Sequence, residues 1–409
     1  MDITHIILII IFGMFIYGGI WYLVSAKAYS LLSPICVIPF FGFFYLSGWI
    51  FHKEKIGGEV SFNETLLLGT ALIFLLVFMI GGSLNLKLPV TARRDLNLQS
   101  VFLTGFLVYS ISLFLFIVIF LQFGGEYFFI SKGARNLLSR TMGFEKFAKD
   151  IMVSGIILLS YYFCRVRRVT SPMFVAVFLT SIFFFIVLEN RSALAIVLLT
   201  SLYFFHQYVK AIKNWNLVVV YGSLLFLGSI AKEIFYGLRV YVAEGWFAPQ
   251  VGQALTSALS QHEFYSWLEI FKNLQYSFVY GETFVKSLKS FVMPGFLGGE
   301  SYSAAQWYVD TFLPEVAEVG NGRAFSMIVE LYINFTVIGL WLVGFTAGVV
   351  INHLERKQVF LLTAFITSTF PFIWTGNSAV LLKQYFAIYF LPAFLIYTTL
   401  QLLPRKVRL

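Results

Sequence analysis

The strongest constraint on this chain is the recurrence of apolar stretches about twenty residues long. An α-helix needs about 20 mostly apolar residues to cross the hydrocarbon core of a bilayer. Hydrophobic residues make up 59% of the 409 residues and charged residues only 12%, whereas soluble domains carry about 25% charged residues. This composition excludes a soluble enzyme, a secreted domain and a disordered scaffold. It predicts an all-α, polytopic integral membrane protein.

About eleven segments have the length and composition of transmembrane helices. The apolar stretch 172–209 is too long for one crossing at about 1.5 Å per residue, and the polar residues Glu189-Asn190-Arg191-Ser192 interrupt it. We therefore expect a helical hairpin with its turn at 189–192. Segment 151–164 is short, so its helix is expected to begin inside the preceding loop. The predicted crossings are 3–24, 31–51, 64–84, 101–122, 151–164, 172–188, 193–209, 216–235, 324–350, 359–375 and 379–402.

Basic residues set the expected orientation. Lys and Arg gather in short loops such as 165–168 and in the final residues 405–408, and short basic loops lie on the cytoplasmic side. With eleven crossings the C-terminus is then cytoplasmic and the N-terminus outside. The first residues lack the basic region of a cleaved signal peptide, so no processing is expected.

Two long connections lie on the outer side in this topology. The second alternates apolar and polar residues at helical spacing from Ser257 to Phe291, which predicts amphipathic helices on the membrane surface or over the bundle. The predicted organisation is transmembrane helices 1–8 in 1–235, with the outer loop 123–150 and the turn 189–192, then the large outer loop 236–323, then transmembrane helices 9–11 in 324–409.

Motifs of soluble catalysis are missing from the sequence. It has no Walker A loop, no HExxH and no CxxC, and its five histidines are scattered. Asp-x-Asp, with which many sugar-nucleotide enzymes hold a metal, does not occur either. These observations disfavour a histidine-based metal site and a cytoplasmic nucleotide-sugar reaction.

Ionisable residues at the outer face remain as candidates for chemistry. Arg191 is either an interfacial arginine whose charged end reaches water or a cation aimed into a cavity to hold an anionic group. Arg239 belongs to a cluster with Lys232 and Glu233, which is either a local charge network or part of the same site. His262 with Glu263, and Arg135 with Arg140, could equally be surface charges.

The segment 320–335 is the most informative. Arg323, Met327, Glu330 and Asn334 are spaced to share one face of a helix that enters from outside. An ionisable residue such as Glu330 costs a few kcal/mol in lipid, so it should face the protein or a wet cavity. It either pairs with an interior cation such as Lys383 or lines an outward-opening active site.

Three local patterns resemble the Wzy-type O-antigen and polysaccharide repeat-unit polymerases. One is Asn190-Arg191-Ser192, similar to the family's arginine-containing hairpin turn. Another is Tyr280-Gly281-Glu282-Thr283-Phe284, in a helix that ends at Pro294. The third is Gly322-Arg323-Ala324-Phe325-Ser326 followed by Glu330-Leu331-Tyr332-Ile333-Asn334-Phe335. Thr336 departs from the family's glycine after Asn-Phe, and Gly295 stands where a basic residue is expected.

The resemblance implies a reaction and a fold. Such enzymes transfer a growing glycan from a polyprenyl diphosphate to a new lipid-linked repeat unit, on a fold similar to type C membrane glycosyltransferases, without metal or other cofactor. It implies a place in the bacterial cytoplasmic (inner) membrane, an active site on the extracytoplasmic side and, as partners, the two lipid-linked oligosaccharides, membrane lipid and a chain-length regulator, but no nucleic acid. The candidate catalytic residues are Arg191, Arg239, Arg323 and Glu330, and the candidate substrate-binding residues are Asn190, Tyr332, Asn334, His262, Lys289 and Arg135.

Two other functions fit the same features less well. An O-antigen ligase or another lipid-sugar glycosyltransferase would share the arginine chemistry, and a ligase should carry an outer-loop histidine, for which His262 is the only choice. A lipid-linked oligosaccharide flippase would be expected to show internal repeats, and none is visible.

Overall fold

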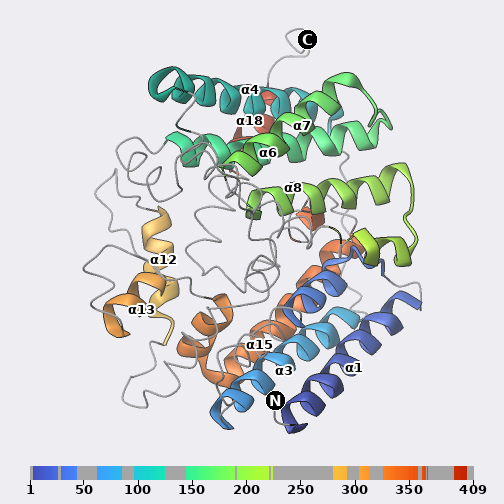
Figure 1. Ribbon diagram of the computed structural model, residues 1–409, viewed down its shortest axis with the longest axis vertical. Helices are drawn as coiled ribbons and strands as arrows, with labels where there is room; N and C mark the ends of the chain where they lie inside the picture. The colour runs from blue at the N-terminus through green and yellow to red at the C-terminus, as the bar shows by residue number, and fades with distance from the viewer. Residues whose placement is uncertain are drawn as a thin grey trace, which may run out of the picture. The chain divides into compact units, whose positions relative to one another are not determined.

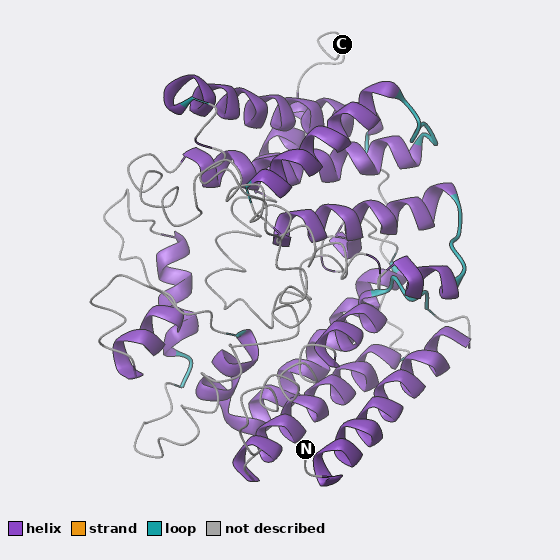
Figure 2. Ribbon diagram, in the orientation of Figure 1, coloured by secondary structure: helices purple, strands orange, loops and turns teal. Residues whose placement is uncertain are grey.

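In the described part of the chain, the computed structural model consists of helices joined by turns and loops, with no strand (Figures 1 and 2). The described residues are 3–25, 29–43, 62–84, 96–124, 127, 144–188, 191–220, 223, 280–292, 304–312, 326–357, 362–364, 366 and 391–402.

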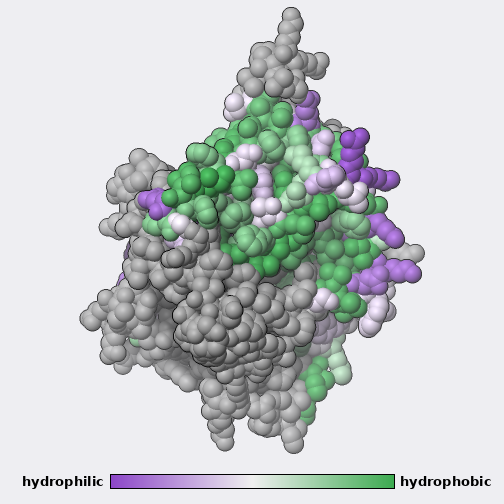
Figure 3. Space-filling view, turned by 45° about the horizontal axis from the view of Figure 1, so that its top comes forward, coloured by the Kyte–Doolittle hydropathy of each residue, from purple (hydrophilic) through white to green (hydrophobic). Residues whose placement is uncertain are grey.

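Four of the described helices are long and apolar enough to cross a membrane. They are α3 (Phe62–Ser83), α4 (Leu98–Phe123), α6 (Phe144–Arg165) and α15 (Met327–Arg356). Large apolar side chains face outward on these helices, and Figure 3 shows a described surface dominated by hydrophobic residues. A soluble protein would bury such side chains. The prediction of a helical, membrane-associated protein is therefore confirmed in this coarse form.

The chain divides into two compact units, each built from two separate stretches of sequence. Unit 1 comprises residues 1–91 and 256–383, and unit 2 comprises 92–255 and 384–409. Unit 1 contains α1 (Ile3–Ser25), α3, α12 (Glu282–Val292), α13 (Ala304–Phe312) and α15. Unit 2 contains α4, α6, α7 (Pro172–Val187), α8 (Arg191–Phe204) with the π-helical turn η2 (Phe205–Val209), and α18 (Leu391–Leu402).

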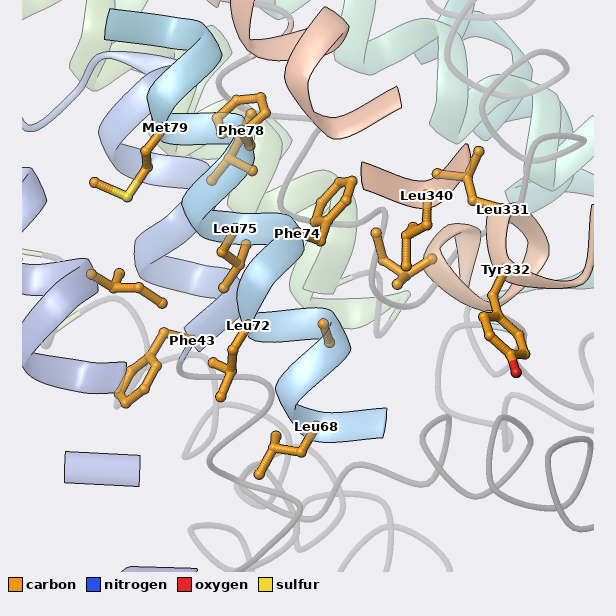
Figure 4. Packing of buried hydrophobic residues seen from close by; sticks show 14 of the residues in the cluster. Phe43, Leu68, Leu72, Phe74, Leu75, Phe78, Met79, Leu331, Tyr332 and Leu340 are labelled. Atoms are coloured by element: carbon orange, nitrogen blue, oxygen red, sulfur yellow. The ribbon is translucent and has the colours of Figure 1, made fainter. Parts of the chain in front are cut away.

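Unit 1 is organised around the contact of α3 with α15. Glycines let the two backbones approach closely, because a Cβ atom on Gly348 would lie 2.1 Å from the Phe78 carbonyl oxygen and one on Gly81 would lie 2.3 Å from that of Phe345. Small residues at such contacts are the usual means of close helix packing in membranes. Around them lies a hydrophobic cluster that runs along α3 and reaches the first turns of α15 (Figure 4).

A polar network closes the other end of the same contact. The Tyr29 hydroxyl donates to Asn352 Oδ1 at 2.6 Å, and Asn352 Nδ2 donates to the Leu84 carbonyl oxygen at 2.7 Å. The Ser33 hydroxyl donates to the carboxylate of Glu355. These bonds tie the end of α3 and the chain around residues 29–33 to the last turn of α15.

Unit 2 confirms two expectations about helix boundaries and changes a third. α6 begins at Phe144, inside the loop that precedes the apolar stretch 151–164, as its shortness predicted. The apolar stretch 172–209 is divided into α7 and α8 as expected. However, α8 already begins at Arg191, so the predicted turn 189–192 is shorter and Arg191 and Ser192 are helical.

The segment 236–323 contains two described helices, the first of which covers the end of the periodic stretch Ser257–Phe291. α12 covers Glu282–Val292 and α13 covers Ala304–Phe312. The side chains of Tyr308 and Ala304 join the hydrophobic cluster of unit 1. This part of the loop is therefore packed on the helices of unit 1.

Candidate functional site

Two sequence patterns that lie about fifty residues apart meet at Asn334. This side chain on α15 is buried, and its Oδ1 accepts a hydrogen bond from the Gly281 backbone N–H at 2.7 Å. Its Nδ2 donates to Thr283 Oγ1 at 2.7 Å and to the Glu330 carbonyl oxygen at 2.6 Å. Both amide hydrogens and the carbonyl oxygen are therefore used within the protein. Asn334 fastens the start of α12 to α15.

The chain reaches α12 through a turn that depends on glycine. Tyr280 has φ of 40° and Gly281 has φ of 88°, so two consecutive residues are in the left-handed region. Glycine adopts this conformation without steric cost. The Gly281 carbonyl oxygen then accepts the first helical hydrogen bond, from Val285 N at 3.0 Å. The turn thus directs the Gly281 N–H at Asn334 and starts α12 in the same step.

Glu330 lies beside this connection and is fully buried. It is in the first turn of α15, which Ser326 caps by accepting a hydrogen bond from Ile328 N at 3.2 Å. The amino-terminal end of a helix carries a partial positive charge, so the position favours a carboxylate. A buried carboxyl group at the end of a membrane helix is a costly feature that proteins usually keep for function.

The helix bends directly after this pair. Thr336 has φ of 61° and ψ of −169°, which is not helical. Phe335 is turned so that its ring lies 5.6 Å from that of Phe284 on α12. A Cβ atom on Gly339 would lie 2.1 Å from Phe335 Cβ, so glycine is needed where Phe335 bends back. The bend and the aromatic contact form a second connection between the two patterns.

The remaining described candidates of unit 1 divide between core and surface. Tyr332 is 7% exposed and belongs to the hydrophobic cluster, at whose α15 end it lies in Figure 4. On α12, Thr283 and Ser287 are fully buried one turn apart, whereas Lys289 is exposed. Lys286 is also partly exposed and pairs with Glu282. α12 therefore presents its lysines away from α15.

In unit 2, Arg191 is the first residue of α8. The nearby helix α6 carries a residue that sequence reasoning missed. Asp150 is fully buried, although the run Glu145-Lys146-Phe147-Ala148-Lys149-Asp150 reads as a charged outer loop. The only signal in the sequence was the shortness of segment 151–164, which required the helix to extend back through these charges.

Several predicted site residues fall outside the described part of the chain. The predicted helical face of Arg323, Met327, Glu330 and Asn334 is described from Met327 onward, where α15 begins. The candidates outside the described residues are Asn190, Arg239, His262, Arg323 and Arg135, as is the suggested partner Lys383.

No known protein family, curated protein or solved structure matches this chain.

The described geometry fixes what the site of unit 1 can do chemically. Glu330 offers a carboxyl group in a dry environment, where it could orient a hydroxyl group or accept its proton. The Lys286 and Lys289 ammonium groups on the other side of α12 could attract an anion. Asn334 uses its amide on protein contacts, so its contribution is to hold α12 in place.

Proposed function

We propose that this protein is a Wzy-type polysaccharide polymerase. It transfers a growing glycan from a polyprenyl diphosphate to the non-reducing end of a new lipid-linked repeat unit, at the outer face of the bacterial cytoplasmic membrane. The product would be O-antigen or a capsular or other exported polysaccharide.

One observation supports this proposal above the others. The two longest patterns that resemble the family, Tyr280–Phe284 and Glu330–Phe335, are bonded to each other through Asn334. Residues that are shared by resemblance and also meet in space are expected where they serve one site. Their position beside a buried glutamate fits a site for a hydroxyl acceptor.

The chemistry assigns a role to each kind of residue. When the glycosidic bond breaks, negative charge builds up on the lipid diphosphate that leaves. Arginines match phosphate oxygens with two parallel hydrogen bonds and stay charged at any working pH. Arg191, Arg239 and Arg323 are the candidates for stabilising this charge, which is most effective in a partly dry cavity. Glu330 would orient the acceptor hydroxyl or take its proton.

The proposed function implies a membrane topology for the chain and an energy source for the transfer reaction. It implies eleven crossings, a type C glycosyltransferase-like fold, an outer N-terminus and a cytoplasmic C-terminus. The energy comes from cleavage of the donor's bond to diphosphate, so neither a nucleotide sugar nor a divalent metal takes part. A chain-length regulator in the same membrane would be the protein partner.

The deciding experiment is reconstitution with the natural substrate class. Purified protein in liposomes is given polyprenyl-diphosphate-linked repeat units from its own host, with EDTA and without nucleotide sugar. We expect a ladder of longer lipid-linked glycans. Transfer that requires a different acceptor lipid would make the protein a ligase. Movement of the substrate between leaflets without elongation would make it a flippase.

A further inference from the structure

Five exposed cations lie at one end of unit 2, in two turns of the chain. The first turn follows α6 and the second follows η2, and Figure 1 shows both on the same side of the unit. Asp and Glu are missing from the sequence between Asp150 and Glu189 and again between Glu189 and Glu233. Within the described part of the chain, none of the five cations forms an ion pair. We call them the α6–η2 cation cluster: Arg165, Arg167, Arg168, Lys210 and Lys213.

Tyr208 brings two arginines of this cluster together. Arg167 Nε donates to the Tyr208 carbonyl oxygen at 3.2 Å, across 41 positions of sequence. The guanidinium carbon of Arg165 lies 5.1 Å from the centre of the Tyr208 ring, where a cation is attracted to the aromatic face. The ring is packed against that of Tyr161 at 5.6 Å. Two guanidinium groups are therefore held near one residue, and two like charges held in one place favour an anion beside them.

The backbone of both turns is fixed by hydrogen bonds. Arg167 has φ of 56°, the left-handed conformation that often ends a helix, and the Arg168 N–H donates to the Phe163 carbonyl oxygen at 2.9 Å. The Ile212 N–H donates to His206 Nδ1 at 3.0 Å and closes the turn after η2. Single π-helical turns such as η2 are frequent at functional sites. The cations are therefore presented from a defined backbone on both sides.

Exposed apolar side chains follow the cluster after each turn. Trp215 and Val219 are exposed and four residues apart, on one face of the helix over 214–220 that follows the second turn. Val175 and Leu179 are exposed at the same spacing on α7, which follows the first turn. Tryptophan is enriched where a protein meets the membrane–water boundary. A ligand of this surface therefore needs a negative group for the cations and apolar chains for the surface beside them.

We propose that the α6–η2 cation cluster binds the head group of an anionic phospholipid of the surrounding bilayer. The phosphate lies against the guanidinium groups of Arg165 and Arg167, and the acyl chains run along the exposed apolar side chains. Arginine matches phosphate oxygens with two parallel hydrogen bonds. Arg167 keeps donors for this purpose, because its bond to Tyr208 uses one of five N–H groups. A phospholipid joins both chemistries in one molecule. This proposal is independent of the proposed function.

Orientation of the chain by its basic loops would not require this geometry. The orientation depends on the number of Lys and Arg residues in short loops, so a lysine at each position would serve. It does not need a tyrosine that contacts one arginine with its ring and another with its carbonyl oxygen. Tyr208 is therefore the feature that separates a lipid site from a loop that only orients the chain.

The direct test is a lipid titration of the purified protein. The protein in dodecylmaltoside micelles is titrated with dioleoylphosphatidylglycerol, and bound lipid is measured by native mass spectrometry. We expect this lipid to bind and dioleoylphosphatidylcholine to bind much more weakly. Equal binding of the two lipids would overturn the proposal. Complete displacement by an equal concentration of inorganic phosphate would also overturn it, because the site would then recognise phosphate without the lipid.

Removal of charge tests the two arginines. A basic residue near an anionic surface contributes a factor of about 5 to binding, so R165Q/R167Q should raise the Kd for phosphatidylglycerol about 25-fold. K357Q, directly after α15 in unit 1, removes a cation elsewhere and should leave the Kd unchanged. An unchanged Kd in R165Q/R167Q, or an equal rise in K357Q, would overturn the site.

Variants of Tyr208 keep the net charge and therefore separate a built site from general electrostatic attraction. Tyr208→Phe keeps the ring beside Arg165 and should bind phosphatidylglycerol as the wild type does. Tyr208→Leu removes the ring and should raise the Kd about two- to fivefold, which corresponds to the loss of an exposed cation–π contact. Equal Kd values in the two variants would overturn the proposed site. This comparison also decides the matter if R165Q/R167Q does not insert into the membrane.

Discussion

At the scale of single residues, Asn334 connects two segments that are far apart in the sequence. One amide group bonds to the turn before α12, to the first turn of α12 and to its own helix. Each of these bonds is inside the protein, where an unpaired polar group is costly. We therefore expect that loss of the Asn334 amide destabilises the packing of α12 on α15.

Replacing Asn334 by alanine should detach α12 from α15. The change leaves the Gly281 N–H without its acceptor, and we expect a loss of about 1–3 kcal/mol. The measurement is thermal unfolding in detergent, with hydrogen exchange of residues 281–292 as the local readout. Thr283→Val should cost less and should add little to Asn334→Ala, since both changes remove the same bond. Fully additive losses would contradict the connection.

Thr336 stores strain that glycine would relieve. Its φ of 61° with ψ of −169° lies in a region that is essentially open to glycine only, and such conformations cost about 1–3 kcal/mol. Thr336→Gly should therefore raise stability by about 1 kcal/mol, after the larger chain entropy of unfolded glycine is subtracted. Thr336→Ser keeps the Cβ atom and should bring no gain. A melting temperature that is unchanged in both variants would argue against the bend.

Arg191 is the residue on which the proposed chemistry depends most. If it stabilises the leaving diphosphate, Arg191→Ala should lower elongation about 100- to 1000-fold, as the loss of one charge-stabilising donor does in other enzymes. The readout is the ladder of polymer made in cells that lack the native gene. A ladder of wild-type length and amount would leave Arg191 as an interfacial arginine.

At the scale of helices, the contact of α3 with α15 depends on glycine, which has no side chain, at Gly81 and Gly348. A Cβ atom on Gly348 would meet the backbone oxygen of Phe78 at 2.1 Å. Backbone atoms of a packed helix cannot move aside as a flexible side chain can. The helices must separate to admit even one methyl group.

Gly348→Ala should therefore lower stability by about 1–3 kcal/mol, the usual cost of overpacking. The matched control is Gly69→Ala on α3, because a Cβ atom there would meet nothing within 4 Å. Alanine also favours helix by up to about 1 kcal/mol, so the control should be neutral or stabilising. Melting of both purified variants in the same detergent compares them. Equal effects would show that the close approach does not matter.

At the scale of the whole molecule, the basic loops predict the orientation in the membrane. The exposed Lys289 on α12 and the exposed Lys213 after η2 are predicted to lie on opposite sides of the membrane. Single cysteines at these positions, with Cys36 and Cys164 replaced by serine, test this directly. A membrane-impermeant maleimide should label K289C in intact cells and K213C only after the cells are opened. Labelling of both cysteine variants in intact cells would contradict the predicted topology.

The sequence by itself determined the approximate positions of several described helices and that they are apolar enough to cross a membrane. Helix length, apolar composition and interruption by polar residues act locally, so the spans of α3, α4 and α15 and the division of 172–209 could be read directly. The sequence also indicated the two patterns at Tyr280 and Glu330, and its expectation that Glu330 faces the protein rather than lipid agrees with the burial of this residue.

Only the tertiary structure decided which helices are neighbours. Apolar helices are nearly equivalent to lipid and to one another, so hydropathy says nothing of the pairing of α3 with α15 or of α6 with α8. It also could not show that Asn334 bonds to a turn 53 positions away, or that Asp150 is buried in a run of charges. Helix pairing depends on glycines that let two backbones approach and on buried polar groups that need a hydrogen-bond partner. Both act through contacts between residues that are far apart in the chain.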